Sequence, residues 1–331
     1  MTSINSEISL PDIHEVEAAR QRLRPYGIVT PLLRSPVLDE LTGATVLVKA
    51  ENLQRTGSFK FRGAFNRLSL IPEADRPGGV VACSSGNHAQ GVAAAARLLG
   101  MRATIVMPSD APELKRARTV ALGARVVLYD RQTENREQIA QGLAKETGAT
   151  FIHPYNDPQV IAGQGTVGLE IADQAKNQGL NLETMVVCTG GGGLASGVAL
   201  ALSDRASDCR FYTAEPAGFD DYARSLRAGH ILKNDKMGGS VCDAVLTPMP
   251  GEVGFEILKN RASEGAVVSD EQALKAVAFA FHELKLVVEP GGAVALAAVL
   301  FDRVPVSGRV VALTLSGGNI DPAMMARAIG S

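Results

Sequence analysis

An excess of charge of either sign is almost absent from this sequence. Lysine and arginine total 33 residues and aspartate and glutamate total 35, so the formal net charge is -2. A chain so close to neutrality has no field that would concentrate nucleic acid or an anionic membrane at its surface. We therefore expect neither nucleic acid nor membrane among its partners.

The sequence also lacks a long uninterrupted apolar segment. The stretch from Leu286 to Leu300 is broken by Glu289 and Pro290 and is too short to span a bilayer. Met1 to Leu23 mixes acidic and basic residues with apolar ones, so no signal peptide is indicated. The 4 cysteines form no CxxC pair, which favours buried reduced thiols. These features predict a cytoplasmic protein without a membrane span.

What the sequence does contain is a regular alternation of short β-branched segments and helical patterns, in a composition that is 46% hydrophobic. This alternation is typical of α/β proteins with parallel-rich sheets. The first series predicts strands at 79–84, 103–108 and 124–130 and helices at 87–100, 111–122 and 132–147. The second predicts strands at 184–189, 209–216 and 309–316, and a helix at 13–24 and a strand at 44–51 should join it. We expect a small domain at 79–156 and a large domain at 1–78 plus 157–331.

Lys60 lies between two aromatic residues, in the segment Ser58-Phe59-Lys60-Phe61-Arg62-Gly63. Exposed lysines usually stand on polar faces, so this setting is unusual. A lysine amine forms an imine with an aldehyde once the ammonium group loses its proton. Taken alone, the segment also fits a lysine at the start of a helix that extends its amine into water.

Three further segments follow predicted strands. Ser84-Ser85-Gly86-Asn87-His88 opens a helix, so its backbone N–H groups suit a carboxylate, although Ser and Asn are also common N-cap residues. The glycines Gly190 to Gly193 leave no side chain between a phosphate and the backbone amides; a purely structural glycine loop is the alternative. Ser316-Gly317-Gly318-Asn319 ends the last strand.

The segment from Glu51 to Ala64 closely resembles the cofactor-lysine motif of the fold-type II pyridoxal 5′-phosphate (PLP) enzymes, above all serine/threonine dehydratases and serine racemases. The three segments above occur in the order expected for that family, and the resemblance covers nearly the whole chain, including His153-Pro154 and Val288-Glu289-Pro290. It implies a tryptophan synthase β-like fold, a homodimer, and PLP held covalently by Lys60, with Asn87 bonded to the phenolic oxygen of its ring. The implied cofactor contacts are Phe59, Lys60, Asn87, Gly190, Gly191, Gly192, Gly193, Leu194 and Ser316, and the substrate carboxylate would be bound by Ser84, Ser85, Asn87 and His88.

A metal site is predicted in the segment that follows the strand at 209–216. Glu215 and Asp221 are carboxylates close in sequence, and carboxylates with a loop carbonyl suit Mg²⁺, Ca²⁺ or Mn²⁺. The family resemblance implies Glu215, Phe219 through its carbonyl, and Asp221 as ligands. A solvated acidic turn is the alternative.

Ser85 bears on whether the chain is a dehydratase or a racemase. Racemisation needs a base on each face of the substrate Cα, and Lys60 supplies only one. Serine racemases and 3-hydroxyaspartate dehydratases carry serine where Ser85 stands, so Ser85 is a candidate second base; the alternative is that it only binds the carboxylate. Arg136 matches an arginine near the substrate of racemases. Leu122 replaces the tyrosine that animal racemases use for nucleotide binding, so ATP activation is not expected.

The resemblance implies a PLP-dependent ammonia-lyase that converts L-threonine, L-serine or both to a 2-oxo acid and ammonia. Lys60 and Ser85 are the catalytic residues that we predict. Serine racemase, L-threo-3-hydroxyaspartate dehydratase and hydroxyectoine-utilisation dehydratase are alternatives within the family. The glycine loop with Glu215 after the next strand also imitates a dinucleotide fingerprint, which would indicate an NAD-dependent oxidoreductase, but Lys60 and Ser316 would then have no explanation.

Overall fold

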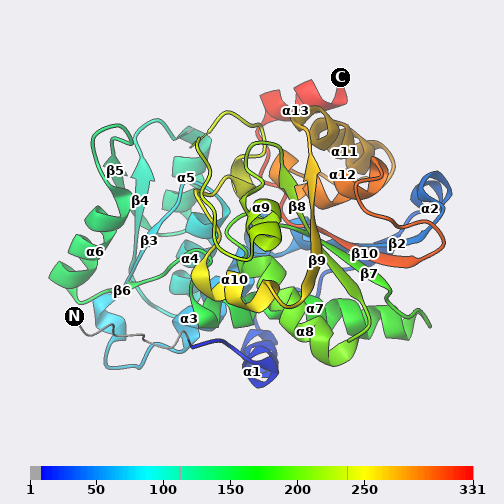
Figure 1. Ribbon diagram of the computed structural model, residues 1–331. Coiled ribbons are helices and arrows are strands. Elements are labelled where there is room, and N and C mark those ends of the chain that lie inside the picture. The colour runs from blue at the N-terminus through cyan, green and yellow to red at the C-terminus, as the bar shows by residue number, and fades with distance from the viewer. Residues whose placement is uncertain (1–8, 112, 237, 331) are drawn as a thin grey trace.

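The computed structural model, which describes residues 9–111, 113–236 and 238–330, contains two β-sheets that lie side by side (Figure 1). In the 6-stranded sheet the order is β1-β2-β10-β7-β8-β9; only β1 runs antiparallel to its neighbour. Its strands are β1 (Leu32–Arg34), β2 (Thr45–Ala50), β7 (Thr184–Cys188), β8 (Arg210–Pro216), β9 (Ala262–Val268) and β10 (Val310–Leu315). The 4-stranded sheet is parallel, in the order β5 (Arg125–Tyr129), β4 (Ala103–Pro108), β3 (Val80–Cys83) and β6 (Thr150–Phe151).

The strands predicted from β-branched segments are present, and β2 pairs with β10 in the large sheet, as expected for the first part of the chain. The helix predicted at 132–147 begins later, at Arg136, because the Asn135 side chain caps it and Asp130 and Glu134 form a local turn. The helix at 158–177 and strand β9 were not predicted. The domain boundaries stay predictions, and residues 1–8 of the predicted large domain lie outside the described residues.

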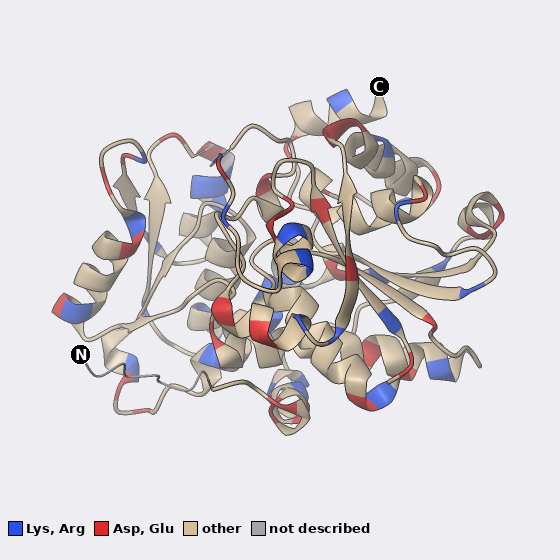
Figure 2. Ribbon diagram, viewed as in Figure 1, with Lys and Arg blue, Asp and Glu red and all other residues tan. Residues whose placement is uncertain are grey.

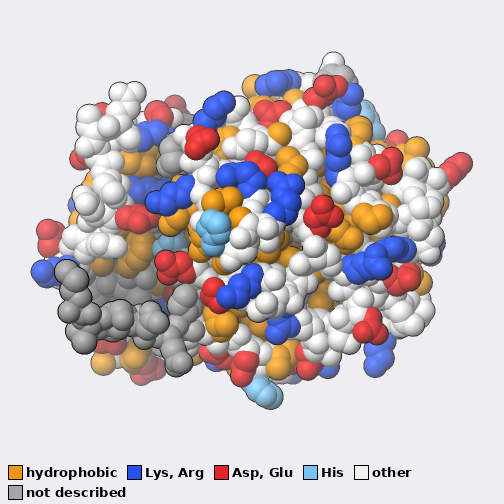
Figure 3. Space-filling model, in the orientation of Figure 1, with side chains coloured by type: hydrophobic (Ala, Val, Ile, Leu, Met, Phe, Trp, Pro, Cys, Tyr) orange, Lys and Arg blue, Asp and Glu red, His pale blue; other side chains and the backbone are white. Residues whose placement is uncertain are grey.

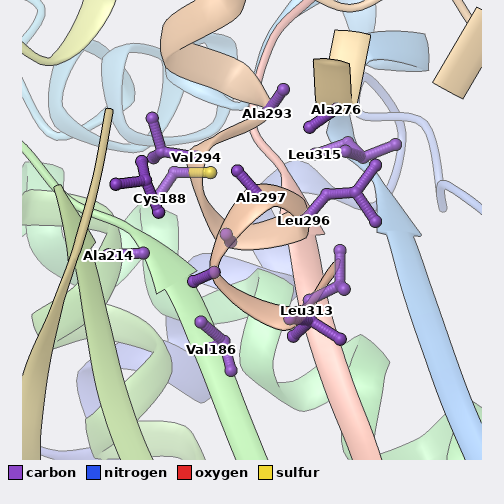
Figure 4. Packing of buried hydrophobic residues seen from close by; sticks show 14 of the residues in the cluster. Val186, Cys188, Ala214, Ala276, Ala293, Val294, Leu296, Ala297, Leu313 and Leu315 are labelled. Carbon is purple, nitrogen blue, oxygen red and sulfur yellow. The ribbon is translucent and has the colours of Figure 1, made fainter. Parts of the chain in front are cut away.

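Alternate residues of the central strands face the two sides of the large sheet. In β7, Val186 and Cys188 face one hydrophobic cluster, whereas Met185 and Val187 face another. Figure 4 shows the first side, where Leu313 and Leu315 of β10 lie beside helix α12 (Val294–Leu300). Because both faces are covered, β7 and β10 are apolar at nearly every position, and their threonines Thr184 and Thr314 are also buried.

Helices cover both sheets. On one face of the large sheet lie α11 (Asp270–His282), α12 and α13 (Pro322–Ile329); on the other lie α7 (Pro158–Asn177) and α8 (Gly193–Arg205). The small sheet packs against α4 (Asn87–Leu98) and, on its other face, α6 (Arg136–Thr147). The remaining helices are α1 (Ile13–Leu23), α2 (Pro36–Thr42), α3 (Lys60–Ser69), α5 (Glu113–Ala121), α9 (Asp221–Ala228) and α10 (Glu252–Leu258).

Acidic and basic residues are intermixed over both parts of the molecule (Figure 2). On the face shown in Figure 3 they also alternate with apolar side chains. None of the described helices has the length and apolar character needed to cross a membrane.

Candidate active site

Lys60 is the first residue of α3, and its half-buried side chain lines a pocket. The Nζ atom donates a hydrogen bond of 2.8 Å to the carbonyl oxygen of Pro154 and lies 5.2 Å from the centre of the Phe59 ring. Burial lowers the pKa of the Lys60 amine to about 8. An appreciable fraction of this amine is therefore unprotonated near neutral pH, the form that attacks an aldehyde.

Lys60 shares a cavity of about 170 Å³ with the loop that precedes α4. Helix α4 has Gly86 as its N-cap residue, and no side chain caps its first turn. Backbone N–H groups at such a helix start are available to an anion. All four residues predicted to bind the substrate carboxylate line this pocket: Ser84, Ser85, Asn87 and His88.

The His88 ring has a structural position within this group. Its Nε2 atom lies 3.1 Å from the carbonyl oxygen of Ile152, and only a protonated nitrogen can donate to that oxygen. Burial, followed by the charge of Lys60, lowers the pKa of His88 to about 3, so the ring is neutral. The backbone of His88, rather than its ring, is thus suited to a carboxylate.

The end of β10 lies directly against the start of α3. The Phe59 backbone N–H donates to the Ser316 carbonyl oxygen at 3.2 Å, and Ser58 forms an antiparallel bridge with Gly317. Ser316 is buried. Two segments that are distant in sequence, those of Lys60 and Ser316, are thereby joined.

The glycine loop lies behind Tyr155, which itself lines the Lys60 pocket. A Cβ atom on Gly191 would be 2.3 Å from the Tyr155 ring, and one on Gly192 would be 1.8 Å from the Tyr222 hydroxyl. Gly192 also has a φ of 91°, which favours glycine. These close contacts alone require glycine at both positions, whether or not a phosphate binds there. The start of α8 at Gly193 nevertheless has no side-chain cap, so its backbone N–H groups are suited to bind a phosphate.

Several residues of the pocket were not assigned a role from the sequence. Tyr155 follows the His153-Pro154 pair, and Glu289 was noted only as part of a motif. The Glu289 carboxylate accepts a hydrogen bond of 2.6 Å from the Asn87 amide; burial, and then Asp243, raise its pKa to about 7. At the same pocket Lys115 pairs with Asp243 at 2.6 Å. These partners are far apart in sequence, so no local sequence pattern indicated that they would meet.

The predicted metal ligands lie between the end of β8, which contains Glu215, and the start of α9 at Asp221. Both Glu215 carboxylate oxygens accept backbone N–H bonds of 2.8 Å from the first turn of this helix, at Tyr222 and Ala223. Asp221 accepts from the Asn234 amide at 2.6 Å, but its other oxygen is buried without a hydrogen-bond partner among the described residues. No group of three or more His, Cys, Asp or Glu side chains in the described part of the chain is arranged to hold a metal ion. The predicted set has only two carboxylates, with a carbonyl as third ligand.

Comparison with known families decides the cofactor. The family model described as "Pyridoxal-phosphate dependent enzyme" matches residues 23–317. The chain belongs to this family. PLP is therefore its cofactor, and the dinucleotide alternative is wrong. The lowered pKa of Lys60, the uncapped start of α8 and the buried Ser316 beside Phe59 fit this group.

Named relatives and solved structures agree with the predicted enzyme class. An L-threo-3-hydroxyaspartate ammonia-lyase from Pseudomonas sp. is 45% identical, over 95% of this chain and 97% of that protein. The solved structure of a threonine deaminase from T.th. has a TM-score of 0.88 at 45% identity, covering 94% of this chain and 99% of that one. Maize serine racemase has a TM-score of 0.91 at 34% identity, covering 97% and 98%. The fold-type II architecture and the ammonia-lyase class are confirmed.

Proposed function

We propose that this enzyme eliminates the β-hydroxyl group of a small hydroxy-amino acid, L-threonine or L-serine, to yield a 2-oxo acid and ammonia. The observation that carries the proposal is the shared pocket of Lys60 and the uncapped loop before α4. A substrate whose carboxylate lies on this loop has its Cα near the Lys60 amine.

The residues have separate tasks in this reaction. The loop from Ser84 to His88 binds the carboxylate through its N–H groups. Bound PLP supplies the electron sink that makes the Cα proton acidic. The Lys60 amine removes that proton, and its pKa near neutrality suits a general base. Ser85 lines the same pocket, and as a base on the second face of Cα it would permit racemisation as a side reaction.

A second substrate, L-threo-3-hydroxyaspartate, is favoured by one particular observation. Arg136 lines the pocket, is half-buried, and forms no ion pair with a described residue. Thr247 lines the same pocket, and its hydroxyl is buried without a hydrogen-bond partner in the described part of the chain. A substrate β-carboxylate would satisfy both groups, whereas the methyl group of threonine would satisfy neither.

The substrate choice is tested by measuring 2-oxo acid release from L-threonine, L-serine and L-threo-3-hydroxyaspartate. If Arg136 binds a β-carboxylate, Arg136→Met should lower kcat/KM for hydroxyaspartate roughly 10- to 150-fold, the worth of a charged hydrogen bond of about 1.5–3 kcal/mol. Activity with L-serine should change little. Arg131→Met, an exposed arginine paired with Asp110, is the control. An equal loss for all three substrates would contradict a role in β-carboxylate binding.

We further propose a structural divalent cation held by Glu215, Asp221 and the Phe219 carbonyl. Mg²⁺ at about 100 times its dissociation constant should add about 2.7 kcal/mol to the free energy of unfolding. Asp221→Asn should remove this stabilisation, while Asp220→Asn, the neighbouring carboxylate that faces Arg224, should keep it. Thermal unfolding with Mg²⁺ or EDTA measures both. Equal Mg²⁺ effects in the two variants would mean that the cation acts elsewhere.

The homodimer and a role in hydroxyectoine use stay predictions from the family resemblance, and the cytoplasmic location stays a prediction from the composition of the sequence. Size-exclusion chromatography with light scattering tests the first of these.

A further inference from the structure

Asn87 belongs to a chain of hydrogen bonds whose direction is fixed by a backbone carbonyl. The Asn319 Nδ2 atom donates to the Thr56 carbonyl oxygen at 2.8 Å and to the Asn87 Oδ1 atom at 2.7 Å. A carbonyl oxygen only accepts hydrogen bonds, so the NH₂ group of Asn319 must face Thr56. The Asn87 amide is then oriented with its oxygen toward Asn319 and its NH₂ group toward Glu289.

Glu289 closes the other end of this chain. Its Oε1 atom accepts from Asn87 Nδ2 at 2.6 Å, and its side chain is 3% exposed. It forms no ion pair with a described residue; Lys115 and Asp243 are the charged groups that influence it across the pocket. A buried acceptor without a cation binds strongly to a neighbouring donor, because hydrogen bonds are stronger in surroundings of low dielectric constant.

The backbone around Glu289 holds the carboxylate in place. The Glu289 N–H donates to the Gly317 carbonyl oxygen at 3.1 Å, and the Glu289 carbonyl accepts from Gly292 at 2.8 Å. A Cβ atom on Gly317 would lie 2.1 Å from Glu289 Oε1 and 3.0 Å from Asn87 Nδ2. The hydrogen bond between Glu289 and Asn87 lies directly against Gly317, so this position has no room for a side chain.

This arrangement determines what Asn87 presents to the pocket. Its oxygen is engaged by Asn319 and one N–H by Glu289, which leaves one N–H as a donor. We propose that Glu289 is a positioning residue which, with Asn319, holds Asn87 as a hydrogen-bond donor toward the phenolic oxygen of PLP bound at Lys60. The inference rests on the proposed cofactor site but is independent of the substrate.

The test compares two substitutions that differ in one property. Glu289→Gln keeps an acceptor oxygen without the charge, and Glu289→Met removes both at similar size. The absorption spectrum of each PLP-loaded protein is recorded without substrate, followed by kcat and KM. We expect the methionine variant to shift the PLP band and to lower kcat about 10- to 100-fold. The glutamine variant should keep the wild-type band and lose less than about 5-fold in kcat.

A double-mutant comparison separates positioning from a general structural effect. In an Asn87→Ala background, Glu289→Met should cause no further spectral shift and little further loss, because the group that it positions is gone. Glu283→Gln, an exposed glutamate in the same segment, is the control and should leave the spectrum unchanged.

Four results would overturn the proposal. The same spectral shift and loss in the glutamine and methionine variants would assign the role to the carboxyl charge or proton. A wild-type spectrum in the methionine variant would show that Asn87 needs no such partner, and fully additive effects with Asn87→Ala would show that the two residues act separately. If Glu289→Met fails to fold, Asn319→Leu is measured in its place and should produce the same shift of the PLP band. An unchanged spectrum in Asn319→Leu is the fourth result that would overturn the proposal. Absence of a PLP band in the wild-type protein would instead refute the cofactor site itself.

Discussion

Replacing Lys60 by alanine is expected to abolish the visible band of lysine-bound PLP and to lower kcat by about 10²–10⁴-fold or more, the usual contribution of a positioned general base. The reason is that Lys115, the other lysine among the described residues that line this pocket, pairs with Asp243 at 2.6 Å and is not free to replace it. Absorbance of the PLP-loaded protein and 2-oxo acid release measure the two effects. Lys145→Ala, on an exposed part of α6, controls for the loss of a lysine.

The same variant has a distinct signature in the protein without PLP. Burial lowers the pKa of Lys60 from 10.5 to about 8, so between these values the unfolded chain holds a proton that the folded protein does not. The free energy of unfolding should therefore rise with pH across this interval, and Lys60→Ala should remove the rise. Unaltered turnover in the alanine variant, or an unaltered pH slope, would refute the assignment of Lys60.

The sequence was sufficient for the parts of the molecule that depend on local pattern. The strand at Thr184–Cys188 is apolar after its first residue because both of its faces are buried, and this composition identified it without the structure. Lys60, Asn87 and Ser316 could be selected because each lies in a segment that resembles a family motif. Their meeting at one pocket or one strand end follows from the parallel order of the sheets.

The rest depends on contacts between distant segments. The Asn87 partner Glu289 is more than half the chain away in sequence, and nothing in its own segment indicates which way its carboxylate points. Tyr155 against Gly191 gives the glycine loop a packing requirement that the phosphate interpretation did not include. Helix α6 starts late because Asn135 caps it and because the side chain of Asp130 binds the backbone of a turn before it. Helical periodicity alone does not reveal such bonds between side chains and backbone.

The largest effect on stability is expected at Arg62, which lies one turn or less beyond Lys60 on α3. Its guanidinium group is 2% exposed and donates to both carboxylate oxygens of Glu51 at 2.8 Å. It also binds Glu170, at 2.6 and 2.8 Å, which in turn pairs with Lys49 at 2.7 Å. Burial alone would raise the pKa of Glu51, but the charge of Arg62 keeps this pKa below its ordinary value. Two cations and two anions thus neutralise one another, and of the four only the Glu170 side chain, 13% exposed, has appreciable contact with water.

Arg62→Met should lower the free energy of unfolding by about 3–5 kcal/mol, because it leaves a buried carboxylate without its cation. Arg67→Met is the matched control: it removes an arginine from the same helix, but one whose pair with Asp157 is partly exposed, so a loss of only about 0–1 kcal/mol is expected. Adding Glu51→Met to Arg62→Met should recover part of the loss, since the remaining pair of Lys49 and Glu170 is neutral. Denaturant unfolding of the four proteins decides the matter. Equal losses for Arg62→Met and Arg67→Met, or no recovery in the double variant, would mean that charge balance is not what Arg62 contributes.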